Sequence, residues 1–337
     1  MRSRFTCNRT RKTSACETQF NGNVMKSPLD SSASEDLGAD FKKALDEGWL
    51  PIREVARQTG VNAVTLRAWE RRYGLIVPQR TPKGHRLFSA EHVQRILTIL
   101  TWLNRGVAVS QVKQLLDAPQ AFSEVIENDW QVLCQTLLQA VTHLNERTLD
   151  DTVNQAMALY PPRTLCEQLL MPLLAELEQR WQGQFGAQME RVFFHSWLRS
   201  KFGARIYHNN RQLRTAPLLL INQSDLPLEP HLWLTAWLVS SADCPVEVFD
   251  WPLPAGELAL AVDHLQARGV LLYSSKAMNL AQLPKLLNGI SCPKMIAGPT
   301  VCIHLAELSV KTGEIADLSL AEDALSAHQD LVQRGLI

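Results

Sequence analysis

LPIREVARQTGVNAVTLRAWERRYGLIVPQRTPKGHRLF, the sequence of residues 50–88, indicates how the amino-terminal part of this 337-residue chain folds. It starts with four residues at helical spacing, namely Ile52, Val55, Ala56 and Thr59. Gly60 follows them and predicts the end of a first helix, because glycine tolerates the left-handed conformation that ends many helices. After a short turn, Asn62 can cap a second helix by accepting hydrogen bonds from its free N–H groups.

The second helix is expected over Ala63–Tyr73, with Gly74 at its end. In this interpretation Val64, Ala68 and Trp69 face the core. Four other side chains lie on the more exposed faces of the helix: Thr65, Arg67, Arg71 and Arg72. Arginine suits such a position, because its planar guanidinium can bond two phosphate oxygens, or the O6 and N7 atoms of guanine.

A short basic hairpin follows the second helix. Lys83 and Gly84 provide its turn, and the apolar alternation resumes with Leu87 and Phe88. Its basic side chains can reach the phosphates beside a groove: Arg80, Lys83, His85 and Arg86. Two helices, a turn and a basic hairpin in this order predict a winged helix-turn-helix, and hence a DNA-binding unit.

The distribution of charge favours the same interpretation. The whole chain has a formal net charge of zero, so attraction to phosphate has to come from a local excess of basic residues. Residues 53–95 contain nine Lys and Arg against three Asp and Glu, an excess of six positive charges. A solvated basic surface is the alternative for a charge cluster taken alone, but the ordered motif argues for a nucleic-acid interface.

The same residues resemble a known family. The sequence TLRAWERRYG at 65–74, followed by Pro78, Arg80, Gly84, RLFS at 86–89 and Val93, is similar to the N-terminal domain of the MerR family of transcription regulators. The form LRAWERRYG is most similar to the subgroup whose effector region resembles cobalamin-binding photoreceptors, and to the related curli and biofilm regulators.

The resemblance implies that the helix at 63–73 enters the major groove and that the wing at 80–87 touches the DNA backbone. It also implies a homodimer, or a higher homo-oligomer, on an inverted repeat of double-stranded promoter DNA, with RNA polymerase as a further candidate partner. We expect DNA contacts from ten residues: Arg53, Thr65, Arg67, Arg71, Arg72, Tyr73, Arg80, Lys83, His85 and Arg86. Metal sensing, known in this family, is not expected, since no cysteine lies between Cys16 and Cys134.

Composition and periodicity divide the chain into stretches 1–47, 48–120, 121–210 and 211–337. The first is polar and is expected to be a disordered tail, in which Met25 offers a second candidate start of translation. After the wing, two more helices are expected at 91–103 and from 109 to 116. The third stretch predicts a helical bundle with helices near 121–142, 147–159, 162–181 and 187–207.

The last stretch alternates strands with helices. Strands are expected at 216–222, 246–249, 270–273 and 294–296, with helices at 231–240, 255–266, 277–287 and 300–308. This alternation predicts a doubly wound open α/β sheet, so the fold class is multidomain α and α/β.

The α/β stretch resembles a cobalamin-binding domain that has lost its cobalt ligand. The family marker Asp-x-His-x-x-Gly corresponds to DLPLEP at 225–230, with Pro227 in the histidine position. His231 is a poor substitute because it would need another loop path. In the bundle, Trp181 and Glu190 match a cobalamin-capping motif, but Arg191 replaces its histidine. We therefore expect no cobalamin and no other cofactor.

Other classes of function find little support in the sequence. No glycine-rich phosphate loop follows the strand at 218–221 and no catalytic triad spacing occurs, so an enzyme is not expected. The seven cysteines form no C-x-x-C pair, which argues against a zinc site and fits a reduced cytoplasmic protein without a membrane segment. The C-terminal region is either an interaction module or the site of another effector. An architectural DNA-binding or adaptor protein remains the alternative to a regulator.

Overall fold

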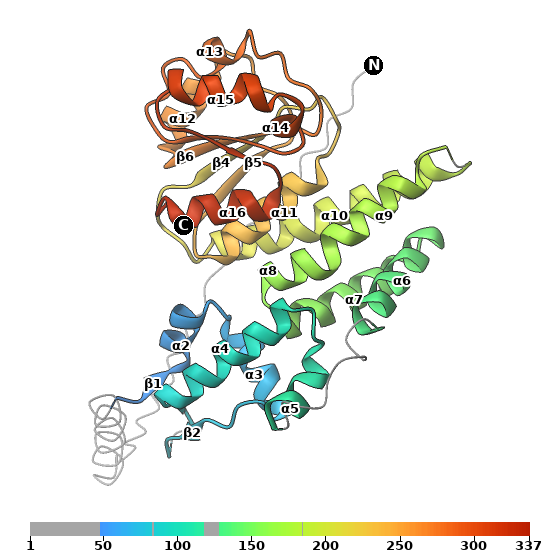
Figure 1. Ribbon diagram of the computed structural model, residues 1–337, viewed down its shortest axis with the longest axis vertical. Coiled ribbons are helices and arrows are strands. Elements are labelled where there is room, and N and C mark those ends of the chain that lie inside the picture. The colour runs from blue at the N-terminus through green and yellow to red at the C-terminus, as the bar shows by residue number, and fades with distance from the viewer. Residues whose placement is uncertain (1–47, 83, 118–127, 184) are drawn as a thin grey trace, which may run out of the picture.

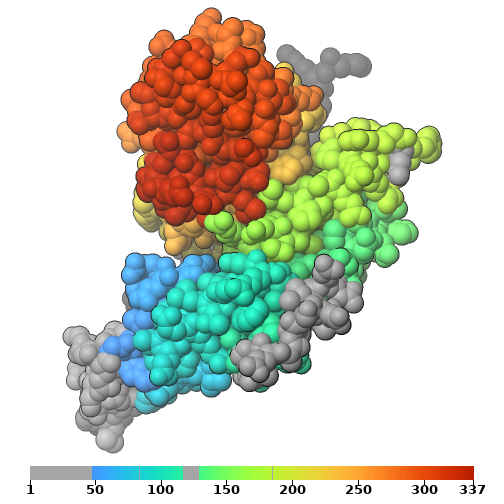
Figure 2. Space-filling view, viewed as in Figure 1, coloured from blue at the N-terminus to red at the C-terminus, as the bar shows by residue number. Residues whose placement is uncertain are grey.

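The computed structural model describes residues 48–337 except positions 83, 118–127 and 184. The prediction of a disordered tail at 1–47 therefore lies outside the described residues. Three parts of the chain follow one another along the molecule: a small amino-terminal unit, a helical bundle and an α/β unit (Figure 1). In the space-filling view the three parts are in contact with one another (Figure 2).

The amino-terminal unit is a winged helix-turn-helix, as the sequence predicts. Its helices are α2 (Ile52–Thr59), α3 (Ala63–Ala68) continued by the π-helical turn η1 (Trp69–Tyr73), α4 (Ala90–Asn104) and α5 (Val109–Asp117). Its antiparallel sheet has the order β1-β3-β2, with β1 (Leu50–Pro51), β2 (Gln79–Arg80) and β3 (Arg86–Phe88). The sequence predicted the hairpin β2–β3 from its turn at Lys83 and Gly84, but not β1, because no turn signal marks this two-residue strand.

The bundle consists of long helices. They are α6 (Asn128–Thr142), α7 (Glu146–Leu159), the consecutive segments α8 (Pro162–Leu165), η2 (Cys166–Leu170) and α9 (Met171–Arg180), and α10 (Ala187–Asn210). The predicted helices at 147–159, 162–181 and 187–207 are confirmed. The first residues of the helix predicted at 121–142 lie outside the described residues.

The α/β unit contains a parallel sheet with the order β5-β4-β6-β7-β8. Its strands are β4 (Leu218–Asn222), β5 (Val246–Phe249), β6 (Gly269–Tyr273), β7 (Lys294–Ala297) and β8 (Leu318–Ala321). Its helices are α11 (Pro230–Ser241), α12 (Leu258–Leu265), α13 (Leu283–Leu286), α14 (Thr300–Ile303), α15 (Leu305–Glu314) and α16 (Ala324–Gln333). This is the predicted doubly wound sheet, with β8 and α16 in addition.

The helix expected at 277–287 is much shorter in the structure. It begins at Leu283, and Pro284 occupies its first turn. Proline is tolerated there because the first N–H groups of a helix have no partner within it, whereas it would break a helix that started at 277.

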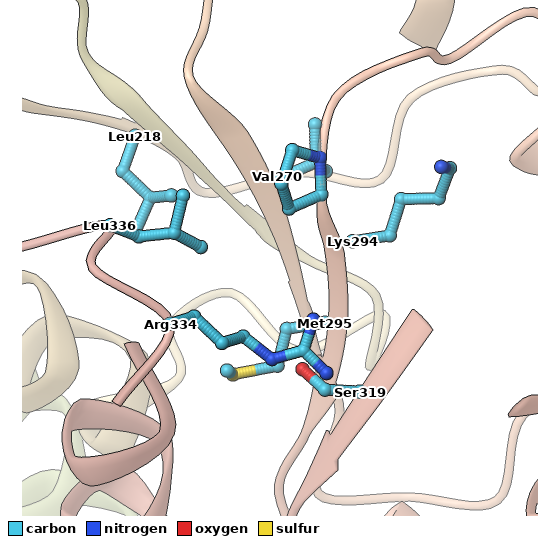
Figure 3. Close-up of a pocket in the computed structure, with 8 residues that line it drawn as sticks. Leu218, Val270, Lys294, Met295, Ser319, Arg334 and Leu336 are labelled. Carbon is cyan, nitrogen blue, oxygen red and sulfur yellow. The ribbon is translucent and has the colours of Figure 1, made fainter. Parts of the chain in front are cut away.

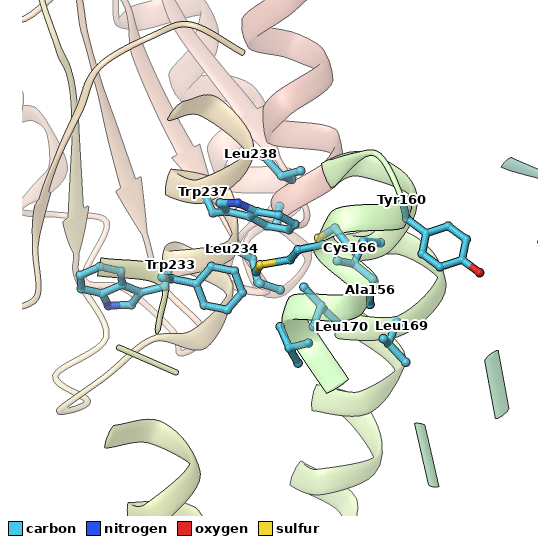
Figure 4. Packing of buried hydrophobic residues seen from close by; sticks show 14 of the residues in the cluster. Ala156, Tyr160, Cys166, Leu169, Leu170, Trp233, Leu234, Trp237 and Leu238 are labelled. Atoms are coloured by element: carbon cyan, nitrogen blue, oxygen red, sulfur yellow. The ribbon is translucent and has the colours of Figure 1, made fainter. Parts of the chain in front are cut away.

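One hydrophobic core links all three parts. Helix α11 is buried along almost its whole length, from Leu232 to Ser240. It lies with α16 on the face of the sheet that meets the bundle, whereas α12, α13 and α15 cover the other face (Figure 1). Trp237 and Leu238 of α11 approach Cys166 and Leu170 of the bundle (Figure 4). The bundle is thus packed against the sheet on one side and against the amino-terminal unit on the other.

Candidate nucleic-acid interface

The recognition helix, residues 63–73, is defined at both ends by its own sequence. The Oδ1 atom of Asn62 accepts a hydrogen bond from the N–H of Thr65 at 2.8 Å, which caps the helix as predicted. Gly74 ends it in the left-handed conformation, with φ of +58°. Its last five residues form a π-helical turn, an irregularity that is often found at functional sites.

Three arginines of the recognition helix are exposed: Arg67, Arg71 and Arg72. Arg53 on α2 is also exposed, and Tyr73 is half-buried. Within the part of the chain that the structure describes, these four arginines form no ion pair. Their guanidinium groups are available to an anionic partner.

Two neighbouring positions on the helix differ from the expectation. Thr65 is 0% exposed and its hydroxyl has no hydrogen-bond partner among the described residues, whereas Val64 is 59% exposed. The reason is that α3 packs both on α2 and on α7 of the bundle, so the helix has a wider buried surface than a lone winged unit would give it. The structure corrects the predictions that Val64 faces the core and that the Thr65 side chain reaches DNA.

Glu70 of the recognition helix holds the wing. Its carboxylate accepts hydrogen bonds from Arg80 Nη2 at 2.6 Å and from Arg86 Nε at 2.5 Å. These arginines face one another on the paired strands β2 and β3. Arg80 and Arg86 therefore join the hairpin to the helix, in addition to any contact with phosphate that the sequence suggested.

The ionisation of Glu70 follows from these contacts. Partial burial raises the pKa of its carboxyl, but the hydrogen bonds from Arg86 and Arg80 lower it more, so that the pKa lies below the usual value. Glu70 is thus a carboxylate at neutral pH, and its negative charge pairs with Arg80 and Arg86 of the wing.

The tip of the wing has its own hydrogen bonds. The backbone N–H of His85 donates to Thr81 Oγ1 at 3.1 Å, and the N–H of Thr81 donates to the carbonyl oxygen of His85 at 2.9 Å. The His85 side chain is exposed. Lys83, also predicted to contact DNA, lies outside the described residues.

One basic residue of the surface was not predicted from the sequence. Lys113 on α5 is exposed, and its Nζ lies 3.7 Å from the point that a Cβ on Gly74 would occupy. It thus adds a cation at the C-terminal end of the recognition helix. The one signal for Lys113 is a basic residue among the apolar positions of the helix expected from 109.

The bundle fixes the amino-terminal unit through polar contacts. The buried indole of Trp69 donates to the carbonyl oxygen of Leu159 at 2.8 Å, and the indole of Trp130 donates to the carbonyl oxygen of Gly106 at 2.8 Å. Thr164 Oγ1 donates to Asn104 Oδ1 at 2.9 Å. Helices α3, α4 and α5 are therefore all held near their ends by the bundle.

The carboxyl ends of β4 and β6, where ligands bind in doubly wound folds, carry a compact polar cluster. The imidazole of His231 stacks on the ring of Tyr273, with 6.5 Å between the ring centroids and 4° between the planes. The carboxylate of Glu229, itself buried, accepts hydrogen bonds from the N–H and hydroxyl of Ser275. Pro227 is exposed on the loop before it and offers no ligand atom.

These residues do not fit cobalamin. A Cβ added to Gly298 would lie 2.9 Å from Cζ of Tyr273 and 2.6 Å from the carbonyl oxygen of Ser274, so the Tyr273 ring already fills the space beside this glycine. His231, stacked on that ring, is not presented as a cobalt ligand. Burial also lowers its pKa and leaves it uncharged.

The matching motif in the bundle is likewise occupied by its own side chains. The indole N–H of Trp181 donates to Glu190 at 3.3 Å, and the guanidinium of Arg191 lies over the Trp181 ring, 5.8 Å from its centroid. Arg191, which replaces the family histidine, thus covers the tryptophan.

One shallow depression of the α/β unit lies at the amino ends of its strands. There, Leu218, Leu336, Arg334 and Met295 surround a depression that leaves no room for a water molecule (Figure 3). In the described part of the chain, no three His, Cys, Asp or Glu residues are grouped as a metal site would need. None of the helices described is both long enough and apolar enough to cross a membrane.

Comparison with known proteins agrees with this architecture. The family model "MerR HTH family regulatory protein" matches residues 50–119, and the model "B12 binding domain" matches residues 133–206. The HTH-type transcriptional regulator MlrA of Salmonella typhimurium is 31% identical over 70% of this chain and 92% of that protein. MlrA of Escherichia coli is 41% identical over 38% of this chain, and the match spans about half (51%) of that relative.

A more distant relative is the HTH-type transcriptional repressor CarH of Myxococcus xanthus, which is 28% identical over 39% of this chain and 47% of that protein. The matched amino-terminal region contains the recognition helix and the wing described above. The chain belongs to the MerR family of helix-turn-helix transcription regulators.

Proposed function

We propose that this DNA-binding regulator acts as a homodimer on an inverted repeat in promoter DNA. One chain carries one recognition helix, and a pair of chains related by a two-fold axis would place two such helices in successive major grooves. RNA polymerase is the further partner that a promoter-bound regulator would meet. The extents 48–120, 121–210 and 211–337 remain our proposal for the three folded domains.

A helix fixed at both of its ends presents exposed guanidinium groups, and no described residue forms an ion pair with them. Arg67, Arg71 and Arg72 supply base or phosphate contacts in the groove, with Tyr73 beside them and Arg53 on the neighbouring helix. The wing, with Arg80, His85 and Arg86, lies along the backbone at the angle that Glu70 sets.

The C-terminal region, in this proposal, binds no cobalamin and catalyses no reaction, and the protein works in the cytoplasm. Support comes from the Tyr273 ring beside Gly298 and from Pro227 in the position of the cobalt ligand. The relatives named above are transcription regulators, which agrees with a non-enzymatic role.

The alternative is an architectural DNA-binding or adaptor protein without a defined operator. DNase I footprinting on the intergenic DNA next to the gene separates the two functions, combined with sedimentation of the protein–DNA complex. We expect one protected inverted repeat and two chains per site. Uniform protection along the fragment would favour the architectural role, and one chain per site would refute the dimer.

A further inference from the structure

A cavity of about 250 Å³ lies where the amino-terminal unit meets the bundle. Two polar side chains come from the amino-terminal unit, Tyr73 at the end of the recognition helix and Ser110 at the start of α5. Val109 of α5 also lines the cavity, and the bundle contributes Asp129, Val132, Leu133 and Tyr160. None of these residues belongs to the α/β unit, although Leu133 and Tyr160 lie within the range 133–206 that the B12 binding domain model matches.

The cavity wall carries a negative charge. Asp129 accepts a hydrogen bond from the hydroxyl of Ser110 at 3.2 Å. No basic side chain among the described residues forms an ion pair with it. A carboxylate held beside apolar groups without a counter-ion favours a cationic ligand.

Aromatic and aliphatic side chains complete the wall. The Tyr160 oxygen accepts a hydrogen bond from the N–H of Val109 at 3.4 Å, and its ring packs against Trp130 with 4.3 Å between the centroids. Burial raises the pKa of Tyr160 to about 12, so the phenol stays uncharged at neutral pH. Val132 and Leu133 present aliphatic surface to the cavity, and the Val132 side chain is 56% exposed.

We propose that this cavity binds a small amphipathic organic cation, such as a single aromatic ring that carries an ammonium group. Asp129 would pair with the positive charge, the faces of Tyr73 and Tyr160 would attract it, and Val132 and Leu133 would cover the apolar part. The volume limits the ligand to about one ring, since pockets for drug-sized ligands begin at about 300 Å³.

Such a ligand would act on DNA binding. Tyr73 is the last residue of the recognition helix, and Tyr160 directly follows Leu159, which anchors that helix through Trp69. A ligand that shifts this junction changes the affinity for DNA, and by reciprocity DNA changes the affinity for the ligand. This consequence rests on the proposed function; binding of the ligand itself does not.

The test is isothermal titration calorimetry of the full chain with benzyltrimethylammonium, in the absence of DNA. Phenylacetate, with one ring and a negative charge, and benzyl alcohol, with one ring and no charge, are the matched ligands. We expect one benzyltrimethylammonium per chain and at least about tenfold weaker binding of the other two. Absence of binding, or equal binding of phenylacetate, would overturn the inference with the wild-type protein alone.

Two variants locate the site. Asp129→Asn keeps the shape of the side chain and is expected to weaken binding by at least about tenfold. Asp151→Asn removes the same charge from an exposed position on α7, outside the cavity wall, and is expected to bind as the wild type does. Equal affinity of the two variants would refute the assignment to this cavity. Because the titration contains no DNA, its failure would leave the proposed function standing.

Discussion

The indole N–H of Trp69 caps the C-terminal end of helix α7 by donating to the carbonyl oxygen of Leu159, 90 residues away in the sequence. Carbonyl groups in the last turn of a helix have no partner within it, so a buried helix end needs a donor from elsewhere. Trp69 belongs to the recognition helix, and its side chain is fully buried in the hydrophobic core. A single side chain therefore joins the recognition helix to the helical bundle.

Replacement of Trp69 by Phe tests this junction. The variant keeps an aromatic ring but loses the N–H donor, and the Leu159 oxygen is left buried without a partner. We expect the free energy of unfolding, measured by urea denaturation of the full chain, to fall by about 1–3 kcal/mol. Trp251→Phe is the control, since Trp251 is 62% exposed, and it should cost less than about 0.5 kcal/mol. Equal losses in the two variants would show that the junction contributes nothing.

Because Glu70 orients the wing, its replacement should change the DNA affinity in the direction opposite to that expected from net charge alone. Removing a carboxylate near DNA strengthens binding in general, because the protein becomes more positive. Glu70→Ala should nevertheless weaken binding to the promoter site by about 1–2 kcal/mol, because Arg80 and Arg86 lose the group that orients the wing.

Glu91→Ala is the control for Glu70→Ala, since Glu91 is exposed on α4 and its loss changes the charge equally. Fluorescence anisotropy with labelled promoter DNA compares the two variants. Binding as tight as or tighter than that of the wild type in both would contradict a positioning role for Glu70.

Two half-buried histidines predict a dependence of stability on pH. Burial, with a contribution from Arg191, lowers the pKa of His195 to about 4, and burial with Arg163 does the same for His328. In the unfolded chain both return to about 6.5, so between pH 6.5 and 4 the unfolded state binds more protons than the folded state. The free energy of unfolding should therefore fall as the pH is lowered through this window.

The expected slope is about 1.4 kcal/mol per pH unit for each histidine once the unfolded chain is protonated. Urea denaturation between pH 7 and 5 measures it. His195→Gln should lower the slope by about 1.4 kcal/mol per pH unit, the contribution of one histidine. His208→Gln, at an exposed position, should leave the slope unchanged. The same slope in wild type and His195→Gln would disprove the assignment.

The cobalamin-like region gives a further prediction. Pro227→His restores an imidazole at the position of the cobalt ligand, but the Tyr273 ring still occupies the space beside Gly298. We expect neither the wild type nor this variant to retain cobalamin on gel filtration, as measured by visible absorbance. Cobalamin and light should leave the DNA affinity of the wild type unchanged. A corrinoid retained by the wild type would contradict both statements.

The parts of the fold that could be predicted are those that local sequence determines. Asn62, Gly60 and Gly74 act on their immediate neighbours, so the two helices and their ends follow from the sequence. The apolar runs at 218–222 and 270–273 likewise indicate buried parallel strands. Strand β8 was not predicted, although with four residues it is as long as the predicted strands β5 and β7.

The parts that could not be predicted depend on contacts between distant residues. Val64 and Thr65 exchange their expected faces because α7 covers one side of the recognition helix. The helical spacing within residues 63–73 cannot show that α7 packs against this helix. In the same way, the basic residues of the sequence do not show that Glu70 forms ion pairs with both Arg80 and Arg86. Nor do they show that Lys113 lies next to Gly74.

In the proposed function, the arginines of the recognition helix read promoter DNA. Fluorescence anisotropy of the full chain on its promoter fragment tests it most directly, with Arg71→Ala compared with Arg211→Ala, an exposed arginine that follows α10 in the bundle. We predict a loss of about 1–3 kcal/mol for Arg71→Ala and wild-type affinity for Arg211→Ala. Full affinity of Arg71→Ala, or no binding of the wild type at low ionic strength, would contradict the account.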